Sequence, residues 1–566
     1  MRQINYFCFL LMIGLLSFSC TQGAKQEVGQ SEEDDNYSLP EKPNILWLVA
    51  EDLSPYVPSF GDSTVQTPNL SRLAAEGICY DHVYAPAPVC APARAAIATG
   101  MYPNHIGAGH MRTGPWFTSG LPQSVYDNAI KRAHPKGVPA YEAVPPPEVK
   151  MMSEYLRMHG YYCSNNAKED YQFFKPVTAW DECSNEAHWR NRKDNQPFFS
   201  IFNFGVTHES RIWVKAEDSL WIPEDAPIIV PPYLPDNEVG RRDVRRMYSN
   251  VVELDQQIGE VLSELEEDGL LESTIIFFYS DHGGPLPRQK RLLYDSGLRV
   301  PMIIRLPQQH AAGSRSDQLI SFIDFAPTVL SLAGIQPPSH MDGRAFMGAF
   351  SDPQERKYIH AAADRFDEVY DRNRAVKDHR YKYIRYFYPD KPMYLPVSYR
   401  EQMPVMQELL KLRDANQLNP EQALWFRDRK PPVELFDTET DPHELNNLAD
   451  DPSLAGKLEE LSDECDRWIE EIEDKGLLDE KDLIAEIWPD SFHPVTADPE
   501  IHNEEAEITI TCSTPGASIG FKMWTEEEPS AWQVYTGPFN LIAGANLKVV
   551  AHRIGYKPST EVEGIP

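Results

Sequence analysis

Cysteine and positive charge are both scarce in this sequence. It contains eight cysteines in 566 residues, and no two of them have Cys-x-x-Cys spacing, so the pattern excludes a dense disulfide framework. Lysine and arginine number 53 against 86 aspartates and glutamates, which gives a formal net charge of −33. Because nucleic-acid phosphates require basic grooves, this balance argues against a nucleic-acid partner. It does not exclude an anionic substrate, which a local cluster of cations can bind at short range.

The apolar run over residues 7–16 is too short to span a bilayer, but it has the length of the hydrophobic part of a signal peptide. We therefore expect residues 1–19 to be a signal peptide and the mature chain to be exported. Residues 16–20 resemble the lipobox of bacterial lipoproteins, in which Cys20 would be lipidated. Phe18 is unusual beside such a site, so an ordinary signal peptide is the alternative. The expected location is the periplasm, or the outer membrane or cell surface through a lipid anchor on Cys20.

Residues 20–42 contain no periodic apolar pattern and include an acidic stretch at 31–35, so we expect an acidic linker. Among the cysteines that remain after export, Cys163 and Cys183 could pair in an oxidising compartment. The sequence leaves that question open.

Three short apolar runs end in polar residues. Continuous apolar runs of this length are typical of strands buried on both faces, which predicts a largely parallel sheet covered by helices. In such sheets ligands bind at the carboxyl ends of the strands, so we expect the polar residues to meet at one edge. The runs are residues 45–50, followed by Glu51 and Asp52; residues 198–204, followed by His208; and residues 274–279, followed by Asp281 and His282.

Helical patterns alternate with these runs and end at glycine, as helix C-termini commonly do. They cover residues 67–76, 147–159 and 242–268. The alternation predicts an α/β domain over residues 43–350. A smaller α+β subdomain is expected over residues 351–495, with an antiparallel strand over 380–385 and a charged helix over 454–475.

The C-terminal residues 500–566 have a different pattern. Short strands over 508–512, 518–523 and 547–551 alternate with proline and glycine turns, which predicts a small β-sandwich. The turns resemble those of the C-terminal module of chitobiases and hexosaminidases. No acid, base or metal-binding cluster stands out in it.

The stretch from Val89 to Gly100 places a cysteine beside a helix N-terminus. Pro92 can begin a helix, which puts Cys90 just before it, where free backbone N–H groups favour an anion. A thiol in that position would be acidic and reactive. The alternative is a buried cysteine packed beneath the helix.

Cys90, Pro92 and Arg94 match the C-x-P-x-R signature, and the chain here resembles the type I sulfatases. The family usually has serine where this chain has Ala93. The resemblance implies an alkaline-phosphatase-like sandwich, and oxidation of Cys90 to formylglycine by a maturation enzyme. Further matches follow in the family's order at residues 43–46, 67–70, 99–103, 280–283, 290, 297–301, 324–328 and 434–442.

The same resemblance implies the site residues. A calcium ion would be bound by Glu51, Asp52, Asp281, His282 and the modified Cys90. Arg94, Lys168 and Lys290 would contact the formylglycine hydrate and the sulfate, and His208 would protonate the leaving group. Taken without the resemblance, Glu51 and Asp52 could be a charged strand end that faces water, and His208 a hydrogen-bonded structural residue.

Two residues depart from the family pattern. Glu51 replaces an aspartate, and Asp170 replaces the histidine of a Lys-x-His pair that begins at Lys168. An aspartate beside a sulfate is unfavourable unless it faces the metal or a sugar hydroxyl. His105 and His110 are nearby candidates to compensate for the missing histidine.

The mixed charges at residues 364–368 and 371–374 indicate a pocket for a sugar, although an exposed charged loop is the alternative. We expect His110, Arg365 and Asp367 to bind substrate. The pattern resembles N-sulfoglucosamine sulfohydrolase-like and iduronate-sulfatase-like groups, which implies a sulfatase for a sulfated polysaccharide or its oligosaccharides. The alternatives are a phosphonate or phosphate ester hydrolase on the same fold and a catalytically silent glycan-binding protein.

Overall fold

The computed structural model describes residues 39–114, 137–505 and 507–564. The predicted signal peptide, Cys20 and most of the predicted linker lie outside these residues. Among the described residues, no helix has the length and apolar character needed to cross a bilayer.

A central sheet of eight strands organises the first part of the chain, in the order β4-β3-β5-β1-β6-β7-β2-β8. All neighbouring pairs are parallel except those that β7 makes with β6 and β2. The prediction of a largely parallel sheet is therefore confirmed. The strands are β1 (Asn44–Ala50), β2 (Ile78–Tyr84), β3 (Tyr162–Asn166), β4 (Glu182–Cys183), β5 (Phe198–Phe204), β6 (Thr274–Ser280), β7 (Arg299–Arg305) and β8 (Ser314–Ser321).

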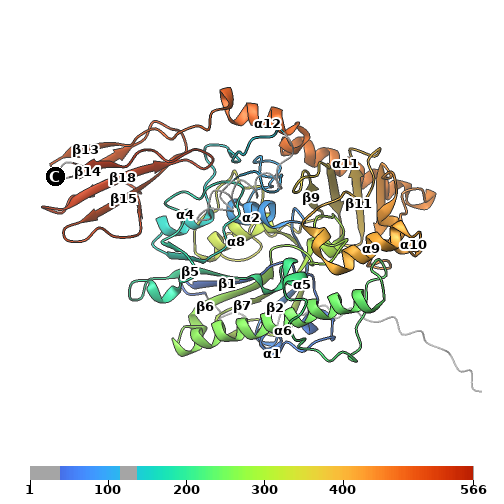
Figure 1. Ribbon diagram of the computed structural model, residues 1–566. Helices are drawn as coiled ribbons and strands as arrows, with labels where there is room; N and C mark the ends of the chain where they lie inside the picture. The colour runs from blue at the N-terminus through green and yellow to red at the C-terminus, as the bar shows by residue number, and fades with distance from the viewer. Residues whose placement is uncertain (1–38, 115–136, 506, 565–566) are drawn as a thin grey trace, which may run out of the picture. The chain divides into compact units, whose positions relative to one another are not determined.

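Helices cover both faces of this sheet. Figure 1 shows α1 (Pro68–Glu76) and α6 (Glu238–Glu267) on one face, and α2 (Cys90–Thr99), α4 (Met152–Met158) and α8 (Phe325–Leu332) on the other. β1 and β6 are buried along almost their whole length, as expected for strands between two helical layers.

Two predicted helices have different bounds in the structure. α6 begins earlier than predicted because the Asn237 side chain accepts a hydrogen bond from the Gly240 N–H and caps the helix. The helix predicted over residues 147–159 is confined to α4. The Glu154 side chain accepts a hydrogen bond from the Met151 N–H (3.0 Å) and caps the helix at this point, so the chain before Met151 remains outside it.

A four-stranded antiparallel sheet follows, in the order β12-β11-β10-β9. Its strands are β9 (Ile359–Ala363), β10 (Asn373–Lys377), β11 (Tyr381–Tyr386) and β12 (Val433–Asp437). The predicted strand over 380–385 is β11, and the predicted charged helix is α11 (Ala455–Glu471). Leu461 and Cys465 of α11 pack on Tyr383 and Leu435 of the sheet.

The C-terminal residues form two small antiparallel sheets. β13 (Glu500–Glu504), β14 (Glu507–Thr511) and β17 (Phe539–Asn540) make one, and β15 (Ser518–Trp524), β16 (Gln533–Val534), β18 (Asn546–His552) and β19 (Val562–Gly564) make the other. Ile508, Phe521 and Val549 belong to their shared core, as expected for a small β-sandwich. The resemblance to the chitobiase module stays a prediction.

The two cysteines that could have paired are separate thiols. All cysteines of the described residues are free. The Cys163 thiol donates to the carbonyl of Ser153 (3.6 Å), and Cys183 accepts a hydrogen bond from Asn165 (3.4 Å).

Candidate active site

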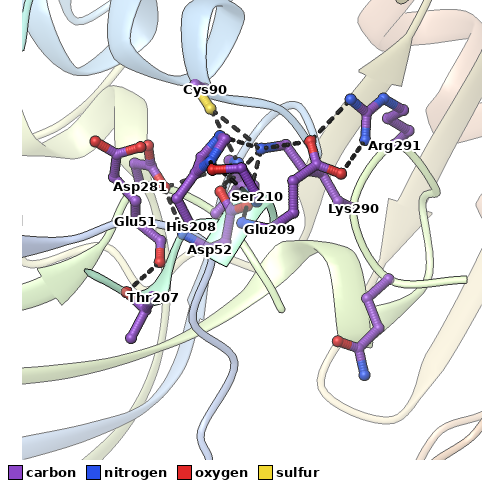
Figure 2. Close-up of polar contacts among 12 residues, drawn as sticks. Glu51, Asp52, Cys90, Thr207, His208, Glu209, Ser210, Asp281, Lys290 and Arg291 are labelled. Carbon is purple, nitrogen blue, oxygen red and sulfur yellow. Dashed lines mark hydrogen bonds and ion pairs between the residues drawn. The ribbon is translucent and has the colours of Figure 1, made fainter. Parts of the chain in front are cut away.

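The polar residues predicted to meet at one edge of the sheet do meet there. Glu51 and Asp52 follow β1, His208 follows β5, and Asp281 and His282 follow β6. The Asp52 N–H donates to Asp281 Oδ1 (3.1 Å), which ties the ends of β1 and β6 together. Asp52, Asp281 and His282 have no exposed surface. Figure 2 shows Glu51, Asp52, His208 and Asp281 below Cys90, which comes from the helical layer above.

Cys90 is the first residue of α2, one position further into the helix than predicted. It is fully buried, and its Sγ lies 3.4 Å from His282 Nε2 and 3.6 Å from Lys290 Nζ. Burial raises the pKa of the thiol, but Lys290 and His282 outweigh burial and lower it to about 6. Cys90 is therefore an acidic thiol among charged groups as well as a buried one, in agreement with the reactive alternative.

Lys290 is the cation at the centre of the site. Its Nζ contacts both Asp52 oxygens (3.0 and 2.9 Å), His208 Nε2 (3.3 Å) and Glu209 Oε1 (3.2 Å), in addition to the thiol. Burial lowers the pKa of Lys290, but Asp52 and the Cys90 thiolate raise it well above its ordinary value. The lysine therefore remains charged in the protein interior.

Two further predicted cations flank the thiol. Arg94 donates through Nε and Nη2 to Asp281 Oδ2 (3.1 and 3.0 Å) and through Nη1 to Asn203 (2.7 Å). Lys168 Nζ lies 3.2 Å from Glu51 Oε2. Burial raises the pKa of Glu51, but Lys168, His208 and Arg94 together lower it to about 2. Glu51 is thus a buried carboxylate of the site and not a strand end that faces water.

The arrangement fits a divalent cation. Two overlapping groups have ligand atoms within 4.8 Å of one another: Asp52, Cys90 and His208, and Cys90, Asp281 and His282. Burial lowers the pKa of His282, but Asp281 and Asp52 raise it to about 10, so the carboxylates strongly favour positive charge at this point. Clustered carboxylate oxygens are the donors that calcium prefers. Of the predicted ligands, Asp52, Cys90, Asp281 and His282 belong to these groups, whereas Glu51 belongs to neither.

The predicted substrate residues are placed differently. Arg365 is fully buried, and its guanidinium donates to Glu480 Oε2 and Oε1 (both 2.7 Å) and to the carbonyl of Met111 (2.8 Å). His110 Nδ1 accepts the Arg365 N–H (3.2 Å). The segment around Arg365 is therefore not an exposed loop. Arg365 does not form a sugar pocket either, because Glu480 of α12 (Glu480–Ile487) already neutralises its charge.

Asp367 does connect to the site, through an arginine. Its Oδ2 accepts from Arg291 Nε (2.8 Å), and Arg291 in turn binds Glu209 through Nη1 and Nη2 (2.8 and 2.9 Å). His105 pairs with Asp342 (3.0 Å), so the idea that it compensates for Asp170 gains no support.

Sequence reasoning missed Glu209, Arg291 and Arg112. Glu209 directly follows His208, and Arg291 directly follows Lys290. Both are buried in the structure, which the sequence does not indicate. Arg112 Nε lies 3.9 Å from Asp367 Oδ1. Their only signal is adjacency to motif residues.

Comparisons with known proteins agree with this geometry. A sulfatase family model matches residues 43–335, and a model of the N-sulphoglucosamine sulphohydrolase C-terminal region matches residues 288–410. An ulvan-active sulfatase of Formosa agariphila is 48% identical over 99% of this chain and 96% of its own. Human N-sulphoglucosamine sulphohydrolase is 25% identical over 77% of this chain and 93% of its own.

A solved structure of a protein in complex with its substrate D-glucosamine-2-N,6-O-disulfate covers 77% of this chain and 100% of its own. Its TM-score is 0.54 at 17% identity, which shows a shared fold. With a family model that matches residues 43–335 and a relative 48% identical over nearly the whole length, the chain belongs to the sulfatase family and is a sulfuric ester hydrolase.

Proposed function

We propose that the protein hydrolyses sulfate esters, or an N-sulfate, of a sulfated polysaccharide or its oligosaccharides, with formylglycine at position 90 and one calcium ion. The observation that carries the proposal is the buried, acidic Cys90 between Lys290 and His282, at the edge where the carboxylates meet. The 48% identical relative is named an ulvan-active sulfatase, so ulvan oligosaccharides are the first substrates to test.

The Cys90 Sγ atom marks the position of the oxygens that formylglycine would carry. The hydrate of formylglycine supplies one hydroxyl for attack on sulfur and a second whose deprotonation releases sulfate. Calcium would be held by Glu51, Asp52, Asp281, His282 and the modified residue 90, where it supplies Lewis-acid polarisation of the sulfate oxygens.

The chain's own residues bind and orient the reacting groups. Lys290, 3.6 Å from Sγ, stabilises the negative charge that grows on the sulfate oxygens, and Lys168 adds a second positive charge. Arg94 holds Asp281 in place through two hydrogen bonds.

We assign His208 the role of protonating the leaving group. Its Nδ1 lies 2.9 Å from Ser210 Oγ, which fixes the ring, and its Nε2 lies beside Lys290. Donation from Nε2 to the departing oxygen gives a neutral alcohol, and water completes the balance from ester to alcohol and sulfate.

We further propose export of the protein, with a lipid anchor on Cys20, and maturation by a formylglycine-generating enzyme. The sequence pattern around residues 7–20 and the C-x-P-x-R motif support these two parts of the proposal.

The decisive experiment is mass analysis of the peptide that contains Cys90, after co-expression with a formylglycine-generating enzyme, combined with turnover of ulvan oligosaccharides. We expect formylglycine at position 90, and a loss of at least about 10⁴-fold in kcat in Cys90→Ala. Full turnover with unmodified cysteine would overturn the mechanism. Equal kcat/KM for the sulfate and phosphate esters of one alcohol would favour the phosphate or phosphonate ester hydrolase instead.

A further inference from the structure

Asp170 is a buried carboxylate without a hydrogen-bond donor. It follows β3, and only 8% of its surface is exposed. Neither Oδ1 nor Oδ2 accepts a hydrogen bond in the part of the chain that the structure describes. Buried polar atoms are almost always hydrogen-bonded, because a buried polar atom left unsatisfied loses its hydration without compensation. A buried carboxylate whose oxygens accept no hydrogen bond is therefore a sign that a ligand supplies the missing donors.

Asp170 lies beside the reacting groups. Lys168 Nζ is 4.0 Å from Asp170 Oδ2, too far for a hydrogen bond, and the same amine contacts Glu51 of the site at 3.2 Å. Arg112 is a second neighbour. Burial lowers the pKa of Arg112, but Asp170, Asp367 and the Cys90 thiolate outweigh burial and raise it. The free carboxylate oxygens are thus close to where a substrate must place its sulfate.

The chemistry of these oxygens selects the group that they bind. A carboxylate only accepts hydrogen bonds and repels a sulfate, so an anionic ligand group is excluded. A metal ion at Asp170 itself is disfavoured by the positive charges of Lys168 and Arg112. Hydroxyl groups remain, since they are neutral and donate. Two free oxygens can accept from two hydroxyls on neighbouring carbons of a sugar.

We propose that Asp170 determines specificity by accepting hydrogen bonds from free hydroxyls of the sugar residue that carries the sulfate. This inference rests on the proposed function and deepens it. A histidine in this position, as in the Lys-x-His pattern, could donate to a sulfate oxygen. Asp170 cannot, so the substitution changes the recognised group from an anion to a hydroxyl pair.

The kinetic test compares Asp170→Asn with the wild type on two substrates. One is a sulfated ulvan oligosaccharide, and the other is the same oligosaccharide with hydrogen in place of both free hydroxyls beside the sulfate. We expect kcat/KM on the first to fall about 100-fold in the variant, because asparagine replaces one of the two acceptor oxygens with an NH2 group that cannot accept from a hydroxyl. On the deoxy substrate, the two proteins should differ by less than about threefold.

Glu169→Gln is the matched control. Glu169 is the neighbouring acid on the same loop, and it is bound to Lys175 instead of facing the site. Its removal takes the same charge from the loop and should change kcat/KM by less than about threefold on both substrates. An equal loss on both substrates in Asp170→Asn would assign Asp170 to the nucleophile or to the loop, and would overturn the proposal, as would no loss at all.

A binding measurement separates this inference from the proposed function. Calorimetric titration of desulfated ulvan oligosaccharide should give a Kd at least about tenfold weaker in Asp170→Asn than in the wild type, with no difference for the deoxy oligosaccharide. No sulfate transfer is involved in this measurement. Absent turnover in every protein would refute the proposed function, whereas an unchanged Kd would refute the role of Asp170.

Discussion

Among the described residues, two buried arginine–glutamate pairs have hydrogen bonds of nearly the same length. Arg291 binds Glu209 through two hydrogen bonds (2.8 and 2.9 Å), and Arg365 binds Glu480 through two (both 2.7 Å). Burial raises the pKa of both glutamates. Arg291 and Lys290 lower that of Glu209 to about 2, and His110 and Arg365 lower that of Glu480 to about 2. By burial and pKa alone, the two pairs cannot be told apart.

Their remaining contacts differ. Glu209 Oε1 also lies 3.2 Å from Lys290 Nζ, and its N–H donates to Asp52 Oδ2 (2.7 Å), so the first pair is one contact from the thiol. Beyond its arginine, Glu480 accepts hydrogen bonds from the hydroxyls of Tyr141 (3.0 Å) and Tyr370. The first pair is connected to the thiol through Lys290, so we expect its removal to affect catalysis. The further contacts of the second pair are tyrosine hydroxyls, so we expect its removal to affect stability.

Removal of the Arg365 charge should give the largest effect. Arg365→Met leaves Glu480 charged and buried, which costs about 3–5 kcal/mol of the free energy of unfolding. We expect KM for an ulvan oligosaccharide to change by less than about threefold, because the guanidinium has no exposed surface. Denaturant unfolding and steady-state kinetics measure both quantities. A stable variant with a strongly raised KM would return Arg365 to the substrate-binding role expected from the sequence.

Glu209→Gln should separate the two pairs in catalysis. A glutamine cannot neutralise Arg291 and Lys290, so Lys290 loses one of its two carboxylate partners and its position relative to Cys90. We expect kcat to fall about 100-fold with a smaller change in KM, since the lysine acts on charge that grows in the transition state.

The matched control is Glu480→Gln, which removes the same charge from the second pair. It should lower the midpoint of thermal unfolding and leave kcat per folded molecule within about threefold. Equal kcat values in the two variants would mean that the contact between Glu209 and Lys290 has no catalytic role.

The site residues that could be predicted are those with a recognisable pattern in the neighbouring sequence. Apolar runs that end in charged residues placed Glu51, Asp52, Asp281 and His282 at one edge, and the structure brings them there. The second pair could not be predicted, because Arg365 and Glu480 are 115 positions apart and no sequence pattern near Arg365 indicates which residue it binds. A charged segment with a distant partner looks the same in sequence as an exposed loop.

The helix predicted over 147–159 is confirmed only as α4, Met152–Met158. Its start depends on the hydrogen bond from the Met151 N–H to the Glu154 side chain, whereas the sequence offers Pro147, a residue that is common at the first position of a helix.

The free energy of unfolding should also depend on pH, because of the charged groups near the second pair. Asp364 and Asp474 share the guanidinium of Arg374, with Arg374 Nη1 2.8 Å from Asp364 Oδ1 and Nε 2.5 Å from Asp474 Oδ2. Burial and the neighbouring Asp474 raise the pKa of Asp364 from 3.8 to about 6, against the opposing effect of Arg374.

A raised pKa means that the folded protein binds this proton more tightly than the unfolded chain does. The stabilisation is complete below pH 3.8 and is lost as pH rises through about 6. Asp364→Asn cannot titrate, so between pH 4 and 7 its free energy of unfolding should rise relative to the wild type by about 1–3 kcal/mol. Denaturant unfolding at several pH values in this range measures the change. If the free energy of unfolding depends on pH in the same way in both proteins, Asp364 is ionised throughout this range. The cluster would then be neutralised by fixed charges alone, like the pair of Arg365 and Glu480.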